Sequence, residues 1–367
     1  MAGGGASAFR FEVTTAEPIL LHGDHLARTD ANSPVFRYGG RTFAFMSHYQ
    51  PLGHTYRRIS DDDLRFAGPL QRVTLIDDPA GTVGKWIESV WRSPSGDFYG
   101  WYHAEEIGVC PTRLFVPHIG AVVSHDHGMT WRCLGAILEA PDTEVDCDYR
   151  NGFLAGGYGD FSVLPDRDER YFYFHFSSYV ASERAQGVAV ARCPTAHRDM
   201  PIGKVEVWQG HVWMPFRRTL PRPIWPIARG WRHVDPDSFW GPAVHYNRDL
   251  GAYVMLLNHT QHGTSDIRQE GIFVSFNERL DDPAGWSVPV RVVSGGVWYP
   301  EAVGLGADDG DTIAGADVRF FMSGFSAWTI RFRRADPSEP PSTPIVVDHD
   351  AWVRLFGRDT PRRLGIG

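Results

Sequence analysis

"GDFSVLPDRDERYFYFHFSS", residues 159–178, shows the pattern that decides the fold. A glycine and an acidic residue precede a short apolar run, and a polar turn then leads into a strand built almost entirely from aromatic residues. Aromatic and β-branched runs bounded by Gly, Pro, Asp and Asn are typical of β-strands, and apolar residues at helical spacing are scarce in this chain. The sequence therefore predicts an all-β protein.

The same pair of strands recurs along the chain. The short first strand is repeated as NSPVF (32–36), WIESVW (86–91), GDFSVL (159–164), WGPAVHY (240–246) and YPEAVGL (299–305). The second strand is repeated as RTFAFMS (41–47), DFYGWYH (97–103), RYFYFHFSS (170–178), AYVMLLN (252–258) and VRFFMSG (318–324). A third strand follows each pair after a loop. We therefore predict a five-bladed β-propeller, in which the first strand of every blade lines the central axis.

The domain organisation follows from this repeat. Residues 1–336 are predicted to form a single propeller domain, in which a strand near residues 17–22 completes the fifth blade and closes the ring. Residues 337–367, rich in Pro and Asp, are predicted to be a C-terminal tail packed on the propeller. The stretch "SHDHGMTW" (124–131) matches the Asp-box pattern, a turn between the third and fourth strands of a blade. Asp126 is therefore expected to bind turn amides rather than to act in catalysis.

Composition and charge exclude several classes of function. The formal net charge is −8, so neither nucleic acid nor an anionic membrane is an expected partner. Aromatic residues make up 13% of the chain, which suits strands and cores but also the stacking of sugar rings. The cysteines show no zinc-like spacing, so no metal site is predicted from them, and a Cys110–Cys147 disulfide is left open. The chain shows no leader-like or membrane-length apolar segment, so a cytoplasmic protein is expected.

Acidic residues recur where the predicted first strands begin. The positions expected at the axis are Asp30 and Asn32 in blade one, Glu88 in blade two, Asp160 in blade three, Asp237 and Trp240 in blade four, and Glu301 in blade five. A single acidic residue at a strand start is most often a strand-end cap. A set of carboxyl groups that converge on one axis, in contrast, is what enzymatic cleavage of a glycosidic bond requires. One group protonates the leaving oxygen while another attacks the sugar or activates water.

The repeat, and residues 159–178 in particular, resembles the five-bladed β-propeller glycoside hydrolases, the arabinanase, xylosidase and fructofuranosidase superfamily. The resemblance implies hydrolysis of a furanoside or short oligosaccharide by Asp30, Glu88, Asp160 and Glu301. Asp160 matches the acidic position of blade three, and Glu88, which lies between two tryptophans, is the favoured proton donor. The blade-one position is Asn32, and an amide cannot act as base or nucleophile. Either Asp30 takes that role, or the pair is assembled differently, or hydrolytic activity has been lost.

Other residues are expected to bind substrate. These candidates are Asn32, His103, Trp240, His245, Trp298, Tyr299 and Arg319. The two histidines suit sugar hydroxyls or, as in some propeller hydrolases, a structural axial cation such as calcium; no other cofactor is expected. The alternative function is a non-catalytic carbohydrate-binding or interaction propeller, which Asn32 favours. A sialidase is less favoured, because those propellers have six blades.

Overall fold

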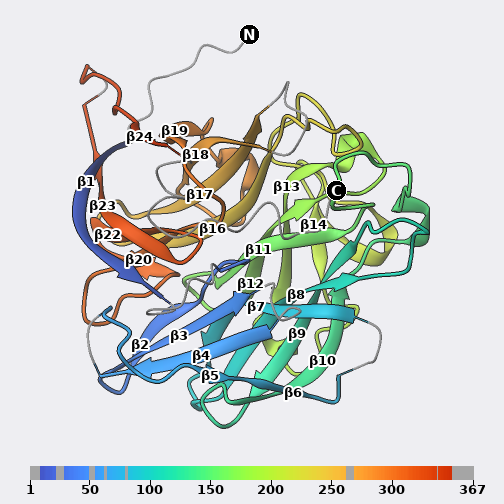
Figure 1. The fold of residues 1–367 in the computed structure, drawn as a ribbon, viewed down its shortest axis with the longest axis horizontal. Helices are drawn as coiled ribbons and strands as arrows, with labels where there is room; N and C mark the ends of the chain where they lie inside the picture. Colours follow the sequence, from blue (N-terminus) through green and yellow to red (C-terminus); the bar gives the residue numbers. More distant parts are fainter. Residues whose placement is uncertain are drawn as a thin grey trace.

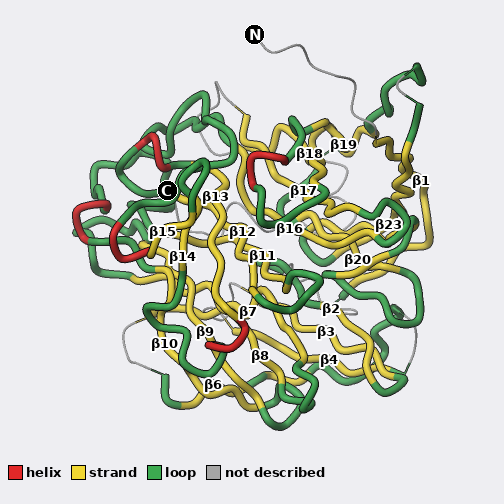
Figure 2. Tube along the Cα trace, turned by 180° about the vertical axis from the view of Figure 1, so that it is seen from behind, coloured by secondary structure: helices red, strands yellow, loops and turns green. Residues whose placement is uncertain are grey.

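The computed structural model describes residues 9–21, 29–48, 54–61, 64–78, 82–261, 268–336 and 338–348. Within these residues the regular structure is all β, apart from five single 3₁₀ turns at Asp142–Glu144, Glu183–Ala185, Thr195–His197, Phe216–Arg218 and Pro283–Gly285. None of the described helical segments has the length and hydrophobicity needed to span a membrane. The prediction of an all-β protein is confirmed (Figure 2).

The strands form five sheets, and three of these follow one another in the first two thirds of the chain. The first sheet contains β2 (Val35–Tyr38), β3 (Arg41–His48), β4 (His54–Ser60) and β5 (Gln71–Arg72). The second contains β7 (Thr82–Arg92), β8 (Phe98–Glu106), β9 (Val116–Ser124), β10 (Thr130–Leu138) and, at its edge, β6 (Thr74–Ile76). The third contains β11 (Tyr158–Pro165), β12 (Tyr171–Ser178), β13 (Gly187–Pro194), β14 (Glu206–Trp208) and β15 (Trp213–Pro215).

Two further sheets complete the fold. The fourth contains β16 (Phe239–Asn247), β17 (Ala252–Gln261), β18 (Arg268–Asn277) and β19 (Val290–Gly295), with β21 (Ile313–Ala314) and β24 (Ile345–Val347) at its edges. The fifth contains β20 (Pro300–Gly304), β22 (Asp317–Met322), β23 (Phe325–Arg334) and β1 (Phe9–Leu20). The described part of the predicted tail thus reaches the fourth sheet, where β24 pairs in parallel with β19. The boundary at residue 336 stays a prediction, and residues 349–367 lie outside the described part.

The N-terminal strand joins the last sheet, as the sequence predicts. β1 pairs antiparallel with β23, from Phe9 opposite Arg334 to Leu20 opposite Phe325. Figure 1 shows this pairing as a blue strand beside red strands. The first described strand, β1, and the late strand β23 therefore share a sheet, which joins the beginning of the ring to its end.

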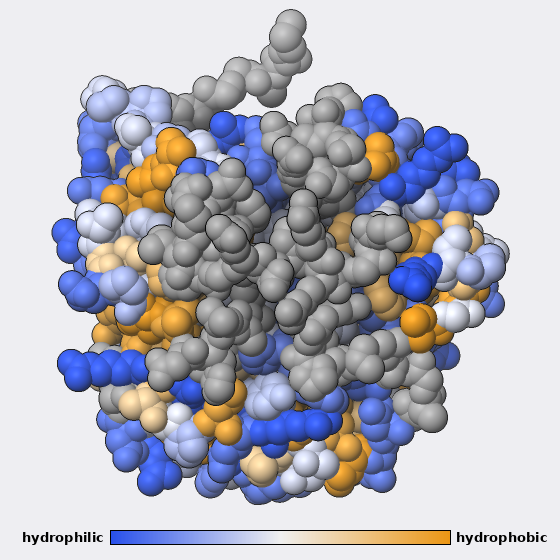
Figure 3. Space-filling view, viewed as in Figure 1, coloured by the Kyte–Doolittle hydropathy of each residue, from blue (hydrophilic) through white to orange (hydrophobic). Residues whose placement is uncertain are grey.

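Hydrophobic side chains pack between neighbouring sheets. One cluster joins the first and second sheets through Phe45 and Trp131, and others join the second to the third, the third to the fourth and the fourth to the fifth. Val35 and Phe321 belong to a further cluster, which joins the fifth sheet back to the first. On the described surface in Figure 3, hydrophobic residues are interspersed with hydrophilic ones. The sheets therefore have a propeller-like arrangement held by the cores between them.

The turn at residues 124–131 lies between β9 and β10, the third and fourth strands of its meander. The Asp126 carboxylate accepts hydrogen bonds from the amides of Met129 and Thr130, at 3.0 and 2.8 Å. Gly128 has a φ of 78°, and the buried Trp131 ring meets Phe45 of the first sheet edge to face. Asp126 thus has a structural role here, whereas the identification of this turn as an Asp-box stays an interpretation.

Two loops are joined by a disulfide. Cys110, between β8 and β9, is bonded to Cys147, between β10 and β11, with the Cα atoms 5.5 Å apart. Cys133 and Cys193 are free thiols. The pairing that the sequence left open is therefore formed in the structure.

Candidate active site

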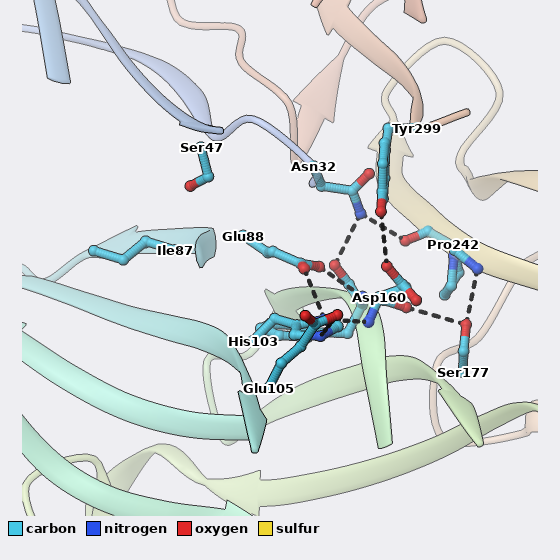
Figure 4. Close-up of polar contacts among 12 residues, drawn as sticks. Asn32, Ser47, Ile87, Glu88, His103, Glu105, Asp160, Ser177, Pro242 and Tyr299 are labelled. Carbon is cyan, nitrogen blue, oxygen red and sulfur yellow. Dashed lines mark hydrogen bonds and ion pairs between the residues drawn. The ribbon is translucent and has the colours of Figure 1, made fainter. Parts of the chain in front are cut away.

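The candidate site lies at one end of the first strands of three neighbouring sheets, where the pairing of each first strand with its second strand is irregular. In β7 the pairing with β8 skips Glu88, and in β11 the pairing with β12 skips Asp160. In β16 it skips the Gly241–Pro242 step. A bulge leaves an extra residue unpaired and re-aims its side chain. Glu88 and Asp160 are thereby turned toward each other, so the two acidic residues of blades two and three are brought together (Figure 4).

His103 on β8 lies between the Glu88 side chain and the Asp160 backbone. Its Nδ1 atom lies 3.3 Å from Glu88 Oε1 and 3.1 Å from the Asp160 amide nitrogen. Its Nε2 atom lies 3.7 Å from Glu105 Oε1. Gly159 has no side chain to obstruct the ring, since a Cβ atom there would lie 2.5 Å from His103 Cε1. The ring is therefore enclosed by three carboxyl groups and one glycine.

The Asp160 carboxylate is held by two tyrosines. The Tyr179 hydroxyl donates to Oδ2, and the Tyr299 hydroxyl donates to Oδ1 at 3.3 Å. The backbone is also constrained: Asp160 has a φ of 43° and Tyr299 a φ of 55°, both in the left-handed region that non-glycine residues rarely adopt. Residues held in such conformations cluster at functional sites. Asp160 is thus fixed by its surroundings on both the side-chain and the backbone level.

Asn32 connects the loop before the first sheet to the third and fourth sheets. Its Nδ2 group donates to the carbonyl oxygens of Phe161 at 2.8 Å and Pro242 at 3.0 Å. The side chain is buried, with 4% of the residue exposed. A carboxylate could not donate either hydrogen bond and would instead face two carbonyl oxygens. The amide at this position therefore has a structural role, which is to donate these two hydrogen bonds, and it cannot act as an acid or a base.

Burial and mutual repulsion shift the protonation of the cluster. Burial raises the pKa of Glu88 to about 7, although the hydrogen bond with His103 opposes the shift. Burial, followed by the charges of Glu105 and Asp160, raises the pKa of Asp30 well above its ordinary value. For His103, burial lowers the pKa, but Glu105, Glu88 and Asp160 together outweigh it and raise the pKa well above the usual value. The surroundings thus favour the protonated forms of Glu88, Asp30 and His103.

The Glu88–His103–Asp160 cluster also offers ligand atoms for a metal ion. Glu88, His103 and Asp160 each offer one ligand atom, and these atoms lie within 4.8 Å of one another. Calcium prefers six to eight oxygen ligands, whereas this set includes an imidazole nitrogen. Its oxygens also accept hydrogen bonds from Phe161, Tyr179 and Tyr299. The set therefore does not fit the calcium ion that the sequence left open, and a structural axial cation stays a prediction.

Glu301 has different surroundings. It lies on β20, and its Oε2 atom accepts a hydrogen bond from the Ser33 amide at 3.3 Å. Burial and the charge of Asp311 raise its pKa well above the ordinary value. The contacts described for Glu301 are thus with residues outside the Glu88–His103–Asp160 cluster.

Aromatic rings pack beside the cluster. Trp240 contacts Trp298 and Tyr299, each with ring centroids 5.9 Å apart, and Trp231 lies between Trp240 and Tyr179. Cys110 and several residues of the two disulfide-linked loops belong to the same hydrophobic cluster. Only 6% of Trp240 is exposed, so the ring supports its neighbours rather than offering an open stacking surface.

No protein-family model matches the chain, and no curated protein matches its sequence. Among solved structures, it is similar to the α-L-arabinanase of Penicillium chrysogenum complexed with arabinobiose, at 14% identity and a TM-score of 0.50, covering 90% of this chain and 87% of the other. It is also similar to the catalytic domain of the GH62 α-L-arabinofuranosidase of Coprinopsis cinerea, at 12% identity and a TM-score of 0.50, covering 88% and 97%.

The chain has the β-propeller fold of these glycoside hydrolases. At this level of identity the similarity shows the fold alone.

Three expected residues lie away from the cluster within this propeller fold. His245 is buried in the core against Phe332, and burial lowers its pKa to about 4, which keeps it neutral. Arg319 donates hydrogen bonds to the carbonyl oxygens of Glu17 and Ser326, so it connects strands of the fifth sheet. Asp237 lies 3.4 Å from His259. These residues were predicted to lie at the axis from their positions along the repeated strands. Position along a strand does not specify which face of the sheet, or which end of the strand, a side chain will occupy.

Two residues of the cluster were not among the predicted site residues. Glu105 shares a face of β8 with His103, because alternate residues of a strand point the same way, and this spacing could have revealed it. Tyr179 directly follows the aromatic strand β12. Its hydroxyl contact with Asp160 had no distinguishing signal, because every neighbouring residue in that strand is also aromatic or small.

Proposed function

We propose that the protein is a glycoside hydrolase that cleaves a furanoside or short oligosaccharide by carboxylate chemistry at the propeller axis. The five sheets, each packed on the next and the fifth on the first, support the further proposal that the propeller has five blades. The observation that carries the proposed function is the pair of buried carboxyl groups, Glu88 and Asp160, with oxygen atoms within 4.8 Å of each other.

In this proposal Glu88 is the proton donor. A general acid works best when its pKa is near the working pH, and burial raises the pKa of Glu88 to about 7. Glu88 would protonate the glycosidic oxygen as the bond to the sugar breaks. His103, within 3.3 Å of Glu88, would stabilise the carboxylate that remains after the proton has left.

Asp160 is proposed as the second carboxylate, in preference to Asp30. Burial and the charges of Glu105 and Asp160 raise the pKa of Asp30 well above its ordinary value, which disfavours the ionised form that a base or nucleophile needs. Asp160 is instead oriented by the hydroxyl groups of Tyr179 and Tyr299. Its short separation from Glu88 favours attack of Asp160 on the anomeric carbon while Glu88 protonates the leaving oxygen. Water activated by the Glu88 carboxylate would then hydrolyse the glycosyl–Asp160 ester, which regenerates both groups and gives net retention of configuration.

The hydrolysis proposal is tested with a panel of aryl furanosides and pyranosides. Glu88→Gln and Asp160→Asn are each expected to lower kcat/KM by about 10²–10⁴-fold, the usual contribution of a general acid, while Glu206→Gln, in a surface ion pair with Arg192, leaves it unchanged. Because Glu88 must be protonated, kcat/KM of the parent protein should fall as the pH rises through about 7. Unchanged hydrolysis in both acidic variants would overturn the proposal.

A second candidate is a carbohydrate-binding propeller without turnover. Two observations favour it: Asn32 supplies an amide where a carboxylate was expected, and only 2% of Glu88 and 7% of Asp160 are exposed. Absence of hydrolysis across the panel, with saturable sugar binding that Asp160→Asn abolishes, would favour this function.

A further inference from the structure

A separate cavity lies between the third and fourth sheets. Its volume is about 160 Å³, and the residues that line it come from β13, from the loop 225–228 and from the start of β16 with its partner β17. Adjacent residues of a strand point to opposite faces. Trp240 accordingly belongs to the aromatic cluster beside Asp160, whereas Phe239 faces the cavity. The cavity therefore lies on the other face of β16 from the aromatic cluster beside the candidate active site, and it is distinct from that site.

Asp237 and His259 form the polar part of the lining. Asp237 Oδ1 lies 3.4 Å from His259 Nε2, and His259 Nδ1 lies 2.6 Å from Glu270 Oε2. Glu270 also pairs with Arg291. Glu270 is the unpaired residue of a bulge between β17 and β18, which directs its carboxylate to the histidine. The Asp237 side chain is 30% exposed and that of His259 is 14% exposed, so Asp237 retains an oxygen for a ligand.

Aromatic rings continue the lining beside this polar group, and the Phe239 ring lies against the His259 ring with centroids 4.4 Å apart. Trp225 and Phe239 are both partly exposed, and their ring centroids are 5.8 Å apart at an angle of 61°. The loop is held in place by hydrogen bonds from the Ile224 amide to the Val188 carbonyl and from the Ala228 amide to the Asp237 carbonyl. Gly187 allows this close approach, because a Cβ atom there would lie 3.0 Å from Ile227. These contacts thus hold the loop in place beside the cavity.

We propose that this cavity binds a single neutral sugar ring. Ligand sites combine apolar walls with a few convergent polar groups, and a sugar needs both a flat ring for its apolar face and a carboxylate for its hydroxyl groups. Sites for drug-sized ligands have volumes of about 300–1,000 Å³, so the smaller cavity suits one ring rather than a chain. A cationic amine would also stack on aromatic rings, but Asp237 is already paired with a histidine. The proposal does not depend on hydrolysis at the axis.

The test measures binding of free L-arabinose, D-galactose and D-glucose to the full chain by saturation-transfer-difference NMR. At least one of these sugars is expected to bind to the Glu88→Gln protein, in which the axial site is altered. Trp225→Ala and Asp237→Asn, made in that background, should each weaken the binding at least about 10-fold, since each removes a side chain that is proposed to contact the sugar.

Matched controls lie outside the cavity. Trp213→Ala removes a partly buried tryptophan that stacks on Arg192, and Glu206→Gln removes a paired carboxylate; neither should alter binding. Circular dichroism establishes that each variant is folded. The proposal is wrong if no sugar binds to the Glu88→Gln protein, or if binding persists unchanged in folded Trp225→Ala and Asp237→Asn variants. Because hydrolysis is measured separately, failure here does not bear on the axial site.

Discussion

At the scale of single residues, Asn32 distinguishes this chain from the pattern it resembles. The resemblance implies a carboxylate at this position, but the side chain donates two hydrogen bonds to backbone carbonyl groups of the third and fourth sheets. The amide therefore joins strands that line the axis. The acidic function is left to Glu88 and Asp160, whose side chains are turned toward each other by bulges.

Asn32→Asp should lower the free energy of unfolding by about 2–4 kcal/mol at pH 8, because it places a buried carboxylate against two carbonyl oxygens. The loss should be smaller at pH 4, where a protonated carboxyl group can donate one of the hydrogen bonds. Urea denaturation at both pH values measures the effect. Val288→Asp, at a position 78% exposed, is the control and should change stability by less than about 0.5 kcal/mol. Equal stability of Asn32→Asp and the parent at pH 8 would contradict this account.

At the scale of elements, the disulfide and the bulges organise the loops around the axis. Cys110 and Cys147 join two loops whose apolar residues pack against Trp240 and Tyr299. The bond therefore supports the aromatic cluster next to Asp160. Disulfides are typical of proteins from oxidising compartments, so this one gives no support to a cytoplasmic location, which stays a prediction.

Replacing both cysteines, Cys110→Ala with Cys147→Ala, should lower the free energy of unfolding by about 4 kcal/mol, the value expected from chain entropy for a separation of 37 residues. Thermal melting with and without dithiothreitol measures the effect. The reductant should lower the Tm of the parent protein and leave that of the double variant unchanged. An equal response of both proteins would show that the disulfide does not stabilise the fold.

At the scale of the whole molecule, β1 joins the beginning of the ring of sheets to its end. It is the first strand of the chain, yet it pairs with β23, more than 300 residues later, and Phe11 packs in the core between the fourth and fifth sheets. The ring is thus closed by a strand from each end of the sequence. Side-chain packing on β1 should therefore contribute to the stability of the whole protein.

Phe11→Ala should lower the free energy of unfolding by about 3–5 kcal/mol, because the ring is 6% exposed and its removal leaves a cavity. Glu12→Ala, at the adjacent exposed position, is the matched control and should have an effect within about 0.5 kcal/mol. Chemical denaturation of the two variants tests this. A small loss in Phe11→Ala would mean that the strand contributes little to closure.

The sequence by itself determined the strands and their grouping. Alternating patterns, turn residues and the recurrence of the aromatic second strand are local properties, so the order of the sheets and the convergence of Glu88 with Asp160 could be predicted from them. Contacts between residues that lie about 50–140 positions apart in the sequence could not be predicted from these local properties. The Asn32–Phe161, His103–Asp160 and Tyr299–Asp160 contacts depend on where bulges shift the register and on how neighbouring sheets pack. Only the tertiary structure decided them, because the position of a residue along a strand does not specify which side chains its neighbours will bring to it.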